Sequence, residues 1–397
     1  MTLNTNGIVR GLNITTTNNT ALADPAGATT AVTVNEVDVS ATTATAVSFN
    51  DLTGTVTLGS TTSTGGTNNV SLTTVAAAVN LGSGALSGSS TGATNHAFLV
   101  SGGAGNVTYT GSITKANQGN VVNISGRTGG TITLSGVING NSSNGINVSN
   151  NTSGAPVVTF TNASKTLNTG ANAAVTLDNN DNAAISFSGG GLAITTTSGV
   201  GFNAINGATA ITVTGSNNAI ASSSATALNV VSSTIGGLGL NFQSISSGNS
   251  TAAADPANGI VLNNTTGSFT VTGNGGNCSM ADTTCTGGTI QNTTGSGIQL
   301  SSAANVSLTR MRIRNSGVHG INGSSGVSGL TLNSSLLDAN GNGDNEHGVN
   351  LVNANGTFLI DATTFNGAAE DLVHIDNTNT TLALTVQNGS HFEYPNP

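Results

Sequence analysis

The segment Ala210–Ile220 reads AITVTGSNNAI, and its central phrase, Ile211–Gly215 (ITVTG), recurs along the whole chain. Apolar and polar residues alternate in each copy, which is the period of a β-strand with one buried face. We therefore expect Ile211 and Val213 to lie in a core, with Thr212 and Thr214 outside. The other copies are Thr55–Gly59, Val107–Gly111, Ile132–Gly136, Val158–Asn162, Ile185–Gly189, Phe269–Gly273, Val306–Arg310, Leu330–Ser334 and Phe358–Ala362.

A second phrase precedes many of these copies, as VVNIS from Val121, GINVS from Gly145, GIQLS from Gly297 and GVNLV from Gly348. Equivalent positions such as Val122 and Ile146 lie 24 residues apart. A period of this length that holds two or three short strands indicates a β-solenoid with irregular coils of roughly 19–32 residues. The sequence predicts one continuous solenoid over residues 1–397. Because Gly11–Pro25 resembles Gly239–Pro256, two duplicated sections, 1–236 and 237–397, are an alternative description.

The composition favours an ordered all-β chain. Of the 397 residues, 55 are Gly and only 6% are charged, so the residues that usually cover exposed helices are scarce. Disorder is the competing interpretation, but 36% of the residues are hydrophobic and they alternate with polar ones.

The repeated phrases resemble those of the right-handed parallel β-helix proteins, the scaffold of pectin lyases and of the passenger regions of bacterial surface adhesins. The resemblance covers nearly the whole chain and is clearest over Gly259–Phe392. It implies the fold and leaves the function open, because this scaffold hosts lyases, hydrolases, adhesins and structural proteins.

Charge and cysteine content restrict the partners and the compartment. The net charge is −9 with seven basic residues, which disfavours nucleic acid, and no apolar run reaches the ~18 residues of a membrane span. Cys278 and Cys285 are expected to form a disulfide that closes a loop insertion at 273–288, which fits an oxidising, extracellular setting.

The weak catalytic candidates are His319, His347 and Glu370. Stacking the segments SGVHGIN, DNEHGVN and AAEDLVH is expected to place these three in one column, with Glu346 beside it. Outward polar residues in contact with water are the simpler alternative. The resemblance to polyuronide-cleaving β-helix enzymes would imply an NTD triplet, an Asp pair, GHG and RIK in order. Here Arg312–Arg314 (RIR) precedes Gly317–Gly320 (GVHG), and neither the triplet nor the pair comes before them.

The segment DANGNGDNE, residues 338–346, resembles the opening of a calcium loop. Its candidate ligands are Asp338, Asn340, Asn342 and Asp344, although Val349 replaces the expected Glu, and a solvated Asn/Gly turn is the alternative. Upstream, Arg310, Arg312 and Arg314 alternate along one strand and should face outward. They are expected either to pair with acids, with Arg314 above Asp338, or to bind an acidic glycan or partner.

The predicted function is structural: a non-catalytic extracellular module of a bacterial surface or fibre-forming protein, used for spacing or adhesion. Open solenoid ends invite association with copies of itself or with flanking β-helix segments, and glycans are further candidate partners. No cofactor besides calcium is expected. The alternatives are a carbohydrate-binding or polysaccharide-degrading β-helix and an ice-binding protein with a Thr ladder, as in Thr108, Thr133 and Thr159.

Overall fold

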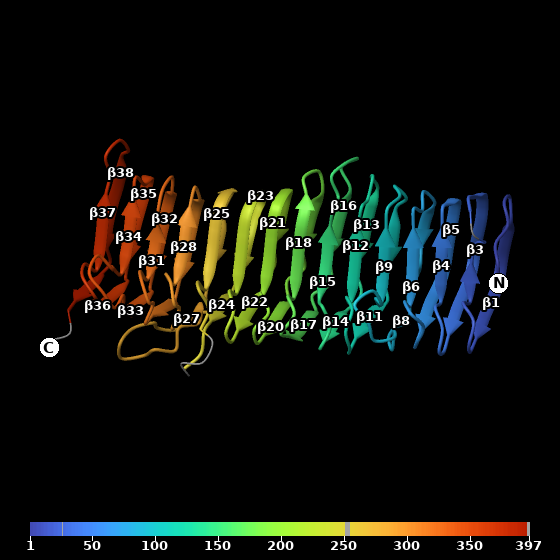
Figure 1. The fold of residues 1–397 in the computed structure, drawn as a ribbon, viewed down its shortest axis with the longest axis horizontal. Coiled ribbons are helices and arrows are strands. Elements are labelled where there is room, and N and C mark those ends of the chain that lie inside the picture. Colours follow the sequence, from blue (N-terminus) through green and yellow to red (C-terminus); the bar gives the residue numbers. More distant parts are fainter. Residues whose placement is uncertain (26, 251–254, 395–397) are drawn as a thin grey trace. The chain divides into compact units, whose positions relative to one another are not determined.

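The computed structural model describes residues 1–25, 27–250 and 255–394, and every regular element among them is a strand (Figure 1). The chain is a parallel β-solenoid of about 15 turns, which confirms the predicted fold class. Its contacts divide it into two compact units, Met1–Leu192 and Ala193–Pro397. Part of the predicted duplicate of Gly11–Pro25, residues 251–254, lies outside the described residues.

The first unit consists of strands β1 to β19. These are β1 (Ile8–Thr16), β2 (Leu22–Ala23), β3 (Thr29–Ala41), β4 (Val47–Asn50), β5 (Leu52–Ser63), β6 (Val70–Thr73), β7 (Ala78–Asn80), β8 (Ala85–Leu86), β9 (Phe98–Ser101), β10 (Val107–Tyr109), β11 (Ser112–Lys115), β12 (Val122–Ser125), β13 (Thr131–Leu134), β14 (Ile138–Asn141), β15 (Ile146–Ser149), β16 (Val157–Phe160), β17 (Lys165–Gly170), β18 (Val175–Asn180) and β19 (Ala184–Phe187).

Strand β20 (Leu192–Thr196) begins at the last residue of the first unit, and the second unit continues to β39. Its strands are β21 (Phe202–Val213), β22 (Ala219–Ser222), β23 (Leu228–Phe242), β24 (Ser244–Ser247), β25 (Ile260–Thr266), β26 (Phe269–Val271), β27 (Gly288–Gln291), β28 (Ile298–Ser301), β29 (Ala304–Thr309), β30 (Met311–Arg314), β31 (Ile321–Gly323), β32 (Ser328–Asn333), β33 (Leu336–Asn340), β34 (Val349–Val352), β35 (Asn355–Asp361), β36 (Thr364–Ala368), β37 (Val373–Asp376), β38 (Leu382–Gln387) and β39 (His391–Glu393).

In the first unit, the coils from β9 onward contain three strands each, and each strand pairs in parallel with its equivalent one coil later. Thus β12 pairs with β15, and β15 with β18, which stacks Val122, Ile146 and Val175. These three residues are fully buried, as the alternating pattern predicts. The core of this unit is therefore a set of aliphatic columns.

The second unit repeats this arrangement along β25, β28, β31, β34 and β37. Ile298 pairs with Ile321, which pairs with Val349. A second column follows β26, β29, β32, β35 and β38, and a third follows β24, β27, β30, β33, β36 and β39. Three parallel sheets thus surround its interior.

The abundance of Asn and Gly follows from the corners between the sheets. Gly126, Asn150 and Asn179 stack at one corner, and each has a left-handed backbone with φ between 55° and 61°. Gly and Asn adopt this conformation at the least cost. The Asn179 amide also donates to Asn150 Oδ1 at 2.9 Å, so the corner side chains themselves bond one coil to the next.

Candidate functional site

His319 and His347 lie two residues before β31 and β34, at equivalent positions of successive coils. Their rings stack with centroids 5.4 Å apart. The backbone amide of His347 donates to Nδ1 of His319 at 3.1 Å, and the amide of Asp371 donates to Nδ1 of His347 at 3.2 Å. Each imidazole therefore accepts a backbone hydrogen bond from the following coil.

The column prediction was wrong for Glu370. The backbone amide of Gly348 donates to the carbonyl of Asp371, so Asp371 follows His347 in the column. Glu370 follows Glu346 instead, since its amide donates to the Glu346 carbonyl at 2.9 Å. The reason is that the column position is counted back from the strand, and Asp371 stands two residues before Val373, as His347 does before Val349.

A ladder of amide side chains runs next to this column. Asn322 donates to Gln299 Oε1 at 3.0 Å, and Asn350 donates to Asn322 Oδ1 at 3.0 Å. His374 ends the ladder, with its Nδ1 2.9 Å from Asn350 Oδ1. Because an amide oxygen can only accept, Nδ1 of His374 is the donor in this contact, and the neutral ring then has its lone pair on Nε2. The sequence-based reasoning did not select His374, although it follows Asn322 and Asn350 in the strand phrase.

Burial lowers the pKa of both His319 and His347; His374 acts in the same direction on both, and His347 also lowers the pKa of His319. Nearby carboxylates oppose this: Glu346 for His319, and Asp371 and Glu370 for His347. The two neutral rings are consistent with the acceptor role of Nδ1, because a protonated imidazole has no acceptor.

The same arrangement occurs in the first unit, which shows what the column position does. Asn68 Oδ1 accepts from the amide of His96 at 2.6 Å, and His96 Nδ1 accepts from the amide of Asn120 at 3.2 Å. Asn and His side chains therefore serve the same purpose at this corner, which is to accept a hydrogen bond from a backbone amide of the next coil. The arrangement gives His319 and His347 a structural role in inter-coil bonding and does not assemble an acid–base pair with Glu370.

Two of the three arginines at 310–314 bind other segments of the chain through their side chains. Arg314 pairs with Asp338 in the strand register, as predicted, but the ion pair is made by Arg312. Arg312 Nε and Nη2 donate to the two carboxylate oxygens of Asp338 at 3.0 and 2.7 Å. Arg310 Nε donates to the carbonyl of Gly276. Two of the three cations thus hold adjacent segments.

The predicted calcium ligands do not face one centre. Asp338 is bound to Arg312, and Asn340 is fully buried, donating to the Ile313 carbonyl at 2.9 Å. Asn342 and Asp344 are exposed. The turn is instead closed by Glu346, whose Oε2 accepts from the backbone amides of Asn342 and Gly343. Two of the four predicted ligands are therefore committed to inter-coil contacts.

The cysteine loop lies between β26 and β27, and Cys278 and Cys285 form a disulfide there. Thr286 Oγ1 donates to the Gly275 carbonyl at 2.7 Å, and Arg310 holds the neighbouring Gly276. The loop is thus fastened at its base as well as by the disulfide.

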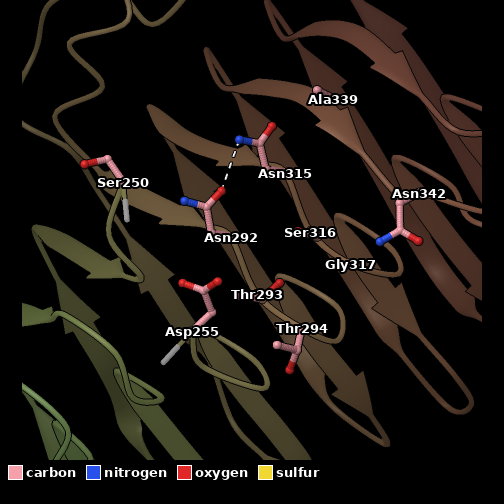
Figure 2. Close-up of a pocket in the computed structure, with 11 residues that line it drawn as sticks. Ser250, Asp255, Asn292, Thr293, Thr294, Asn315, Ser316, Gly317, Ala339 and Asn342 are labelled. Atoms are coloured by element: carbon pink, nitrogen blue, oxygen red, sulfur yellow. Dashed lines mark hydrogen bonds between the residues drawn. The ribbon is translucent and has the colours of Figure 1, made fainter. Parts of the chain in front are cut away.

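An open groove of about 670 Å³ lies beside these coils in the second unit (Figure 2). Asn292 and Asn315 line it and are joined by a hydrogen bond of 3.1 Å, with Ser250, Thr294 and Asn342 nearby. Among the described residues of its lining, Asp255 is the only carboxylate. Hydrolysis of a glycoside uses two carboxylates across the bond, so the lining offers hydrogen bonds without that pair.

The predicted Thr ladder is in register. Thr108, Thr133 and Thr159 are consecutive partners on β10, β13 and β16, and Ser186 follows on β19. In the second unit, Thr270, Ser307 and Thr331 form the corresponding column, in which Leu359 follows before Thr385. The ladder is therefore interrupted by residues that lack the hydroxyl.

Sequence reasoning missed three buried cations in the first unit: Lys115, Arg127 and Lys165. Lys165 Nζ donates to the carbonyls of Asn162, Ser188 and Gly190, and Lys115 Nζ is likewise held by Ser89, Ser90 and Asn117. No ion pair to them occurs among the described residues. Burial lowers the pKa of both lysines to about 8. The signal was present in the sequence, because Lys115 stands in phase with the inward Ile113.

Comparisons with protein-family models, with curated proteins and with solved structures gave no match. The strand register and the buried columns therefore define the class of this chain, which is a parallel β-solenoid. No helix that could span a membrane occurs in residues 1–25, 27–250 and 255–394.

Proposed function

We propose that this chain is a non-catalytic structural module of a secreted or cell-surface protein, which associates end to end with further copies of itself. The observation that carries the proposal is the exposure of inward-type residues in the last coil. Leu384 is 47% and Phe392 42% exposed, whereas their partners in the preceding coil, Phe358 and Phe365, are fully buried. A further coil of the same type would cover them.

The first coil offers the complementary surface. Leu12 on β1 is 45% exposed, while its register partner Val37 is fully buried. β1 pairs only with β3, and β38 only with β35, among the described strands. Unpaired strand edges with apolar side chains favour pairing with another chain. Parallel stacking of β1 of one copy on β38 of another would bury both apolar ends.

Sedimentation equilibrium over a range of protein concentrations tests this proposal. We expect the average mass of the native chain to rise with concentration and the variant Leu384→Lys/Val386→Lys to remain monomeric. Leu238→Lys is the matched control, because Leu238 is 71% exposed but is followed by further coils of its unit. A native chain that stays monomeric, or an equal effect of the control, would contradict end-to-end association.

The extracellular setting is supported by the disulfide, since disulfides persist in oxidising compartments. A role of the adhesin type is part of the same proposal and rests on the resemblance of the repeated phrases.

Carbohydrate binding is the second candidate, favoured by the groove that Asn292, Asn315 and Asp255 line. Its amides and hydroxyls offer the donors and acceptors that a sugar requires. A glycan array would test it: binding that Asn315→Ala abolishes supports this function, and an array without binding contradicts it.

A further inference from the structure

Three side chains from two adjacent coils converge beside the histidine column. His347 precedes β34, whereas Asp371 precedes β37 and His374 lies within it. Each offers one ligand atom, and these atoms all lie within 4.8 Å of one another. The Asp371 side chain is about half exposed, so the cluster is open to ions from the solvent.

His374 is prepared as a metal ligand by the amide ladder. Its Nδ1 donates to Asn350 Oδ1, so the neutral ring offers the lone pair of Nε2 to a metal ion. Histidines that bind metals almost always donate their other ring N–H to an oxygen acceptor, which fixes the ring and increases the basicity of the ligand nitrogen. Asn350 is in turn oriented by its own bond to Asn322.

Asp371 and His347 supply the other two ligand atoms. Asp371 Oδ2 lies 3.6 Å from His347 Nδ1. With metal–ligand bonds of ~2.1 Å, a single ion can bridge two atoms at this separation. Coordination replaces the 3.2 Å hydrogen bond from the Asp371 amide to Nδ1, which is worth about 1 kcal/mol.

The His347 and His374 rings stack with centroids 4.4 Å apart and an interplanar angle of 14°. Two nitrogens bound to one tetrahedral ion are about 3.3 Å apart, so the rings must tilt toward each other on binding. His374 is half-buried, and its ring has to tilt about the hydrogen bond to Asn350.

We propose that His347, Asp371 and His374 bind a divalent transition-metal ion, with Zn²⁺ the best fit to two imidazoles and one carboxylate. Three protein ligands leave a coordination position for water. The ion would cross-link the last coils of the second unit, β34 to β37. This site differs from the calcium ligands predicted from the sequence and does not depend on end-to-end association.

Isothermal titration of the native chain with ZnCl₂ near neutral pH tests the site. We expect one strongly bound Zn²⁺ per chain, and a loss of affinity of at least about 100-fold in His374→Ala. Asn350→Ala should weaken binding by about 10-fold, because it removes only the acceptor that orients His374. His391→Ala is the matched control, since His391 is exposed and its nearest carboxylate is Glu393.

A second measurement guards against variants that fail to fold. Nitrogen-15 spectra of the native imidazoles, recorded with and without Zn²⁺, should show metal-induced shifts at His347 and His374 and none at His391. Binding that survives in His374→Ala, or shifts confined to His391, would overturn the proposal, as would a native chain that takes up no Zn²⁺.

Discussion

Nδ1 of His96 accepts a hydrogen bond of 3.2 Å from the backbone amide of Asn120, in the next coil of the first unit. The acceptor exists only while the ring is neutral. Burial, with a further contribution from Lys115, lowers the pKa of His96 to about 4. Protonation of His96 at low pH therefore requires that this hydrogen bond between coils be broken.

The free energy of unfolding should consequently depend on pH through His96. Between pH 6.5 and about 4 the unfolded chain binds a proton that the folded chain does not. The contribution of His96 to the free energy of unfolding is therefore complete above pH 6.5 and is lost as the pH falls to about 4. The shift corresponds to about 3 kcal/mol.

His96→Asn tests this, because Asn68 accepts the equivalent amide one coil earlier. Denaturant titrations at pH 7 and pH 4 should show a smaller loss of stability in His96→Asn than in the native chain. His391→Asn, at an exposed histidine, should leave the difference unchanged. An identical pH dependence in the native chain and His96→Asn would refute the assignment.

The spacing of the coils leaves no room for a side chain at Gly136. A Cβ atom on Gly136 would lie 1.7 Å from the carbonyl oxygen of Gly111, whereas one on Gly237 would meet no atom within 4 Å. Gly136→Ala should therefore destabilise the chain by at least about 1–3 kcal/mol, as overpacking does. Gly237→Ala should be close to neutral. Thermal unfolding followed by circular dichroism measures both, and equal melting temperatures would disprove this packing argument.

The burial of the lysines has a chemical consequence. Lys115 and Lys165 are the only lysines of the sequence, and their side chains are at most 1% exposed. An amine-reactive ester should therefore leave both lysines of the folded chain unmodified. Both lysines should react after unfolding in guanidinium. Peptide mass spectrometry locates the label, and rapid modification of Lys165 in the folded chain would contradict its burial.

The ion pair between Arg312 and Asp338 links β30 to β33. Their side chains are 15% and 9% exposed, and the pair is bidentate, so its removal should cost more than that of a surface pair. A double-mutant cycle with Arg312→Met and Asp338→Asn should give a coupling energy of about 2 kcal/mol. Asp344→Asn, at an exposed acid of the following turn, should change stability by less than about 0.5 kcal/mol. A coupling energy near zero would show that the two side chains act independently.

The strands and their register were predictable because the phrase has a period of two within a strand and recurs with each coil. Ile132, Val158 and Ile185 were aligned from the sequence and are consecutive partners in the structure. The residue types at the corners were predictable as well, because Asn and Gly adopt a left-handed backbone at low cost.

The candidate site was harder to predict, because it depends on residues just outside the strands. Turn length decides whether Glu370 or Asp371 follows His347, and only counting back from Val373 gives the observed pairing. Similarly, Asn340 belongs to the buried side of β33 rather than to the turn that follows. The partners of Lys115 and Lys165 are mostly backbone carbonyls of turns, which no residue type in the sequence reveals.

The parallel register also governs how each unit gains and loses its structure. Hydrogen-bonded partners such as Val122 and Ile146 are separated by one coil of sequence, so a coil can be completed as soon as its predecessor provides a template. Folding can then spread step by step from any formed coil, and opening starts where a coil has a neighbour on one side only. The resistance of such a unit to unfolding therefore depends on its terminal coils. The amide protons of its interior coils exchange last.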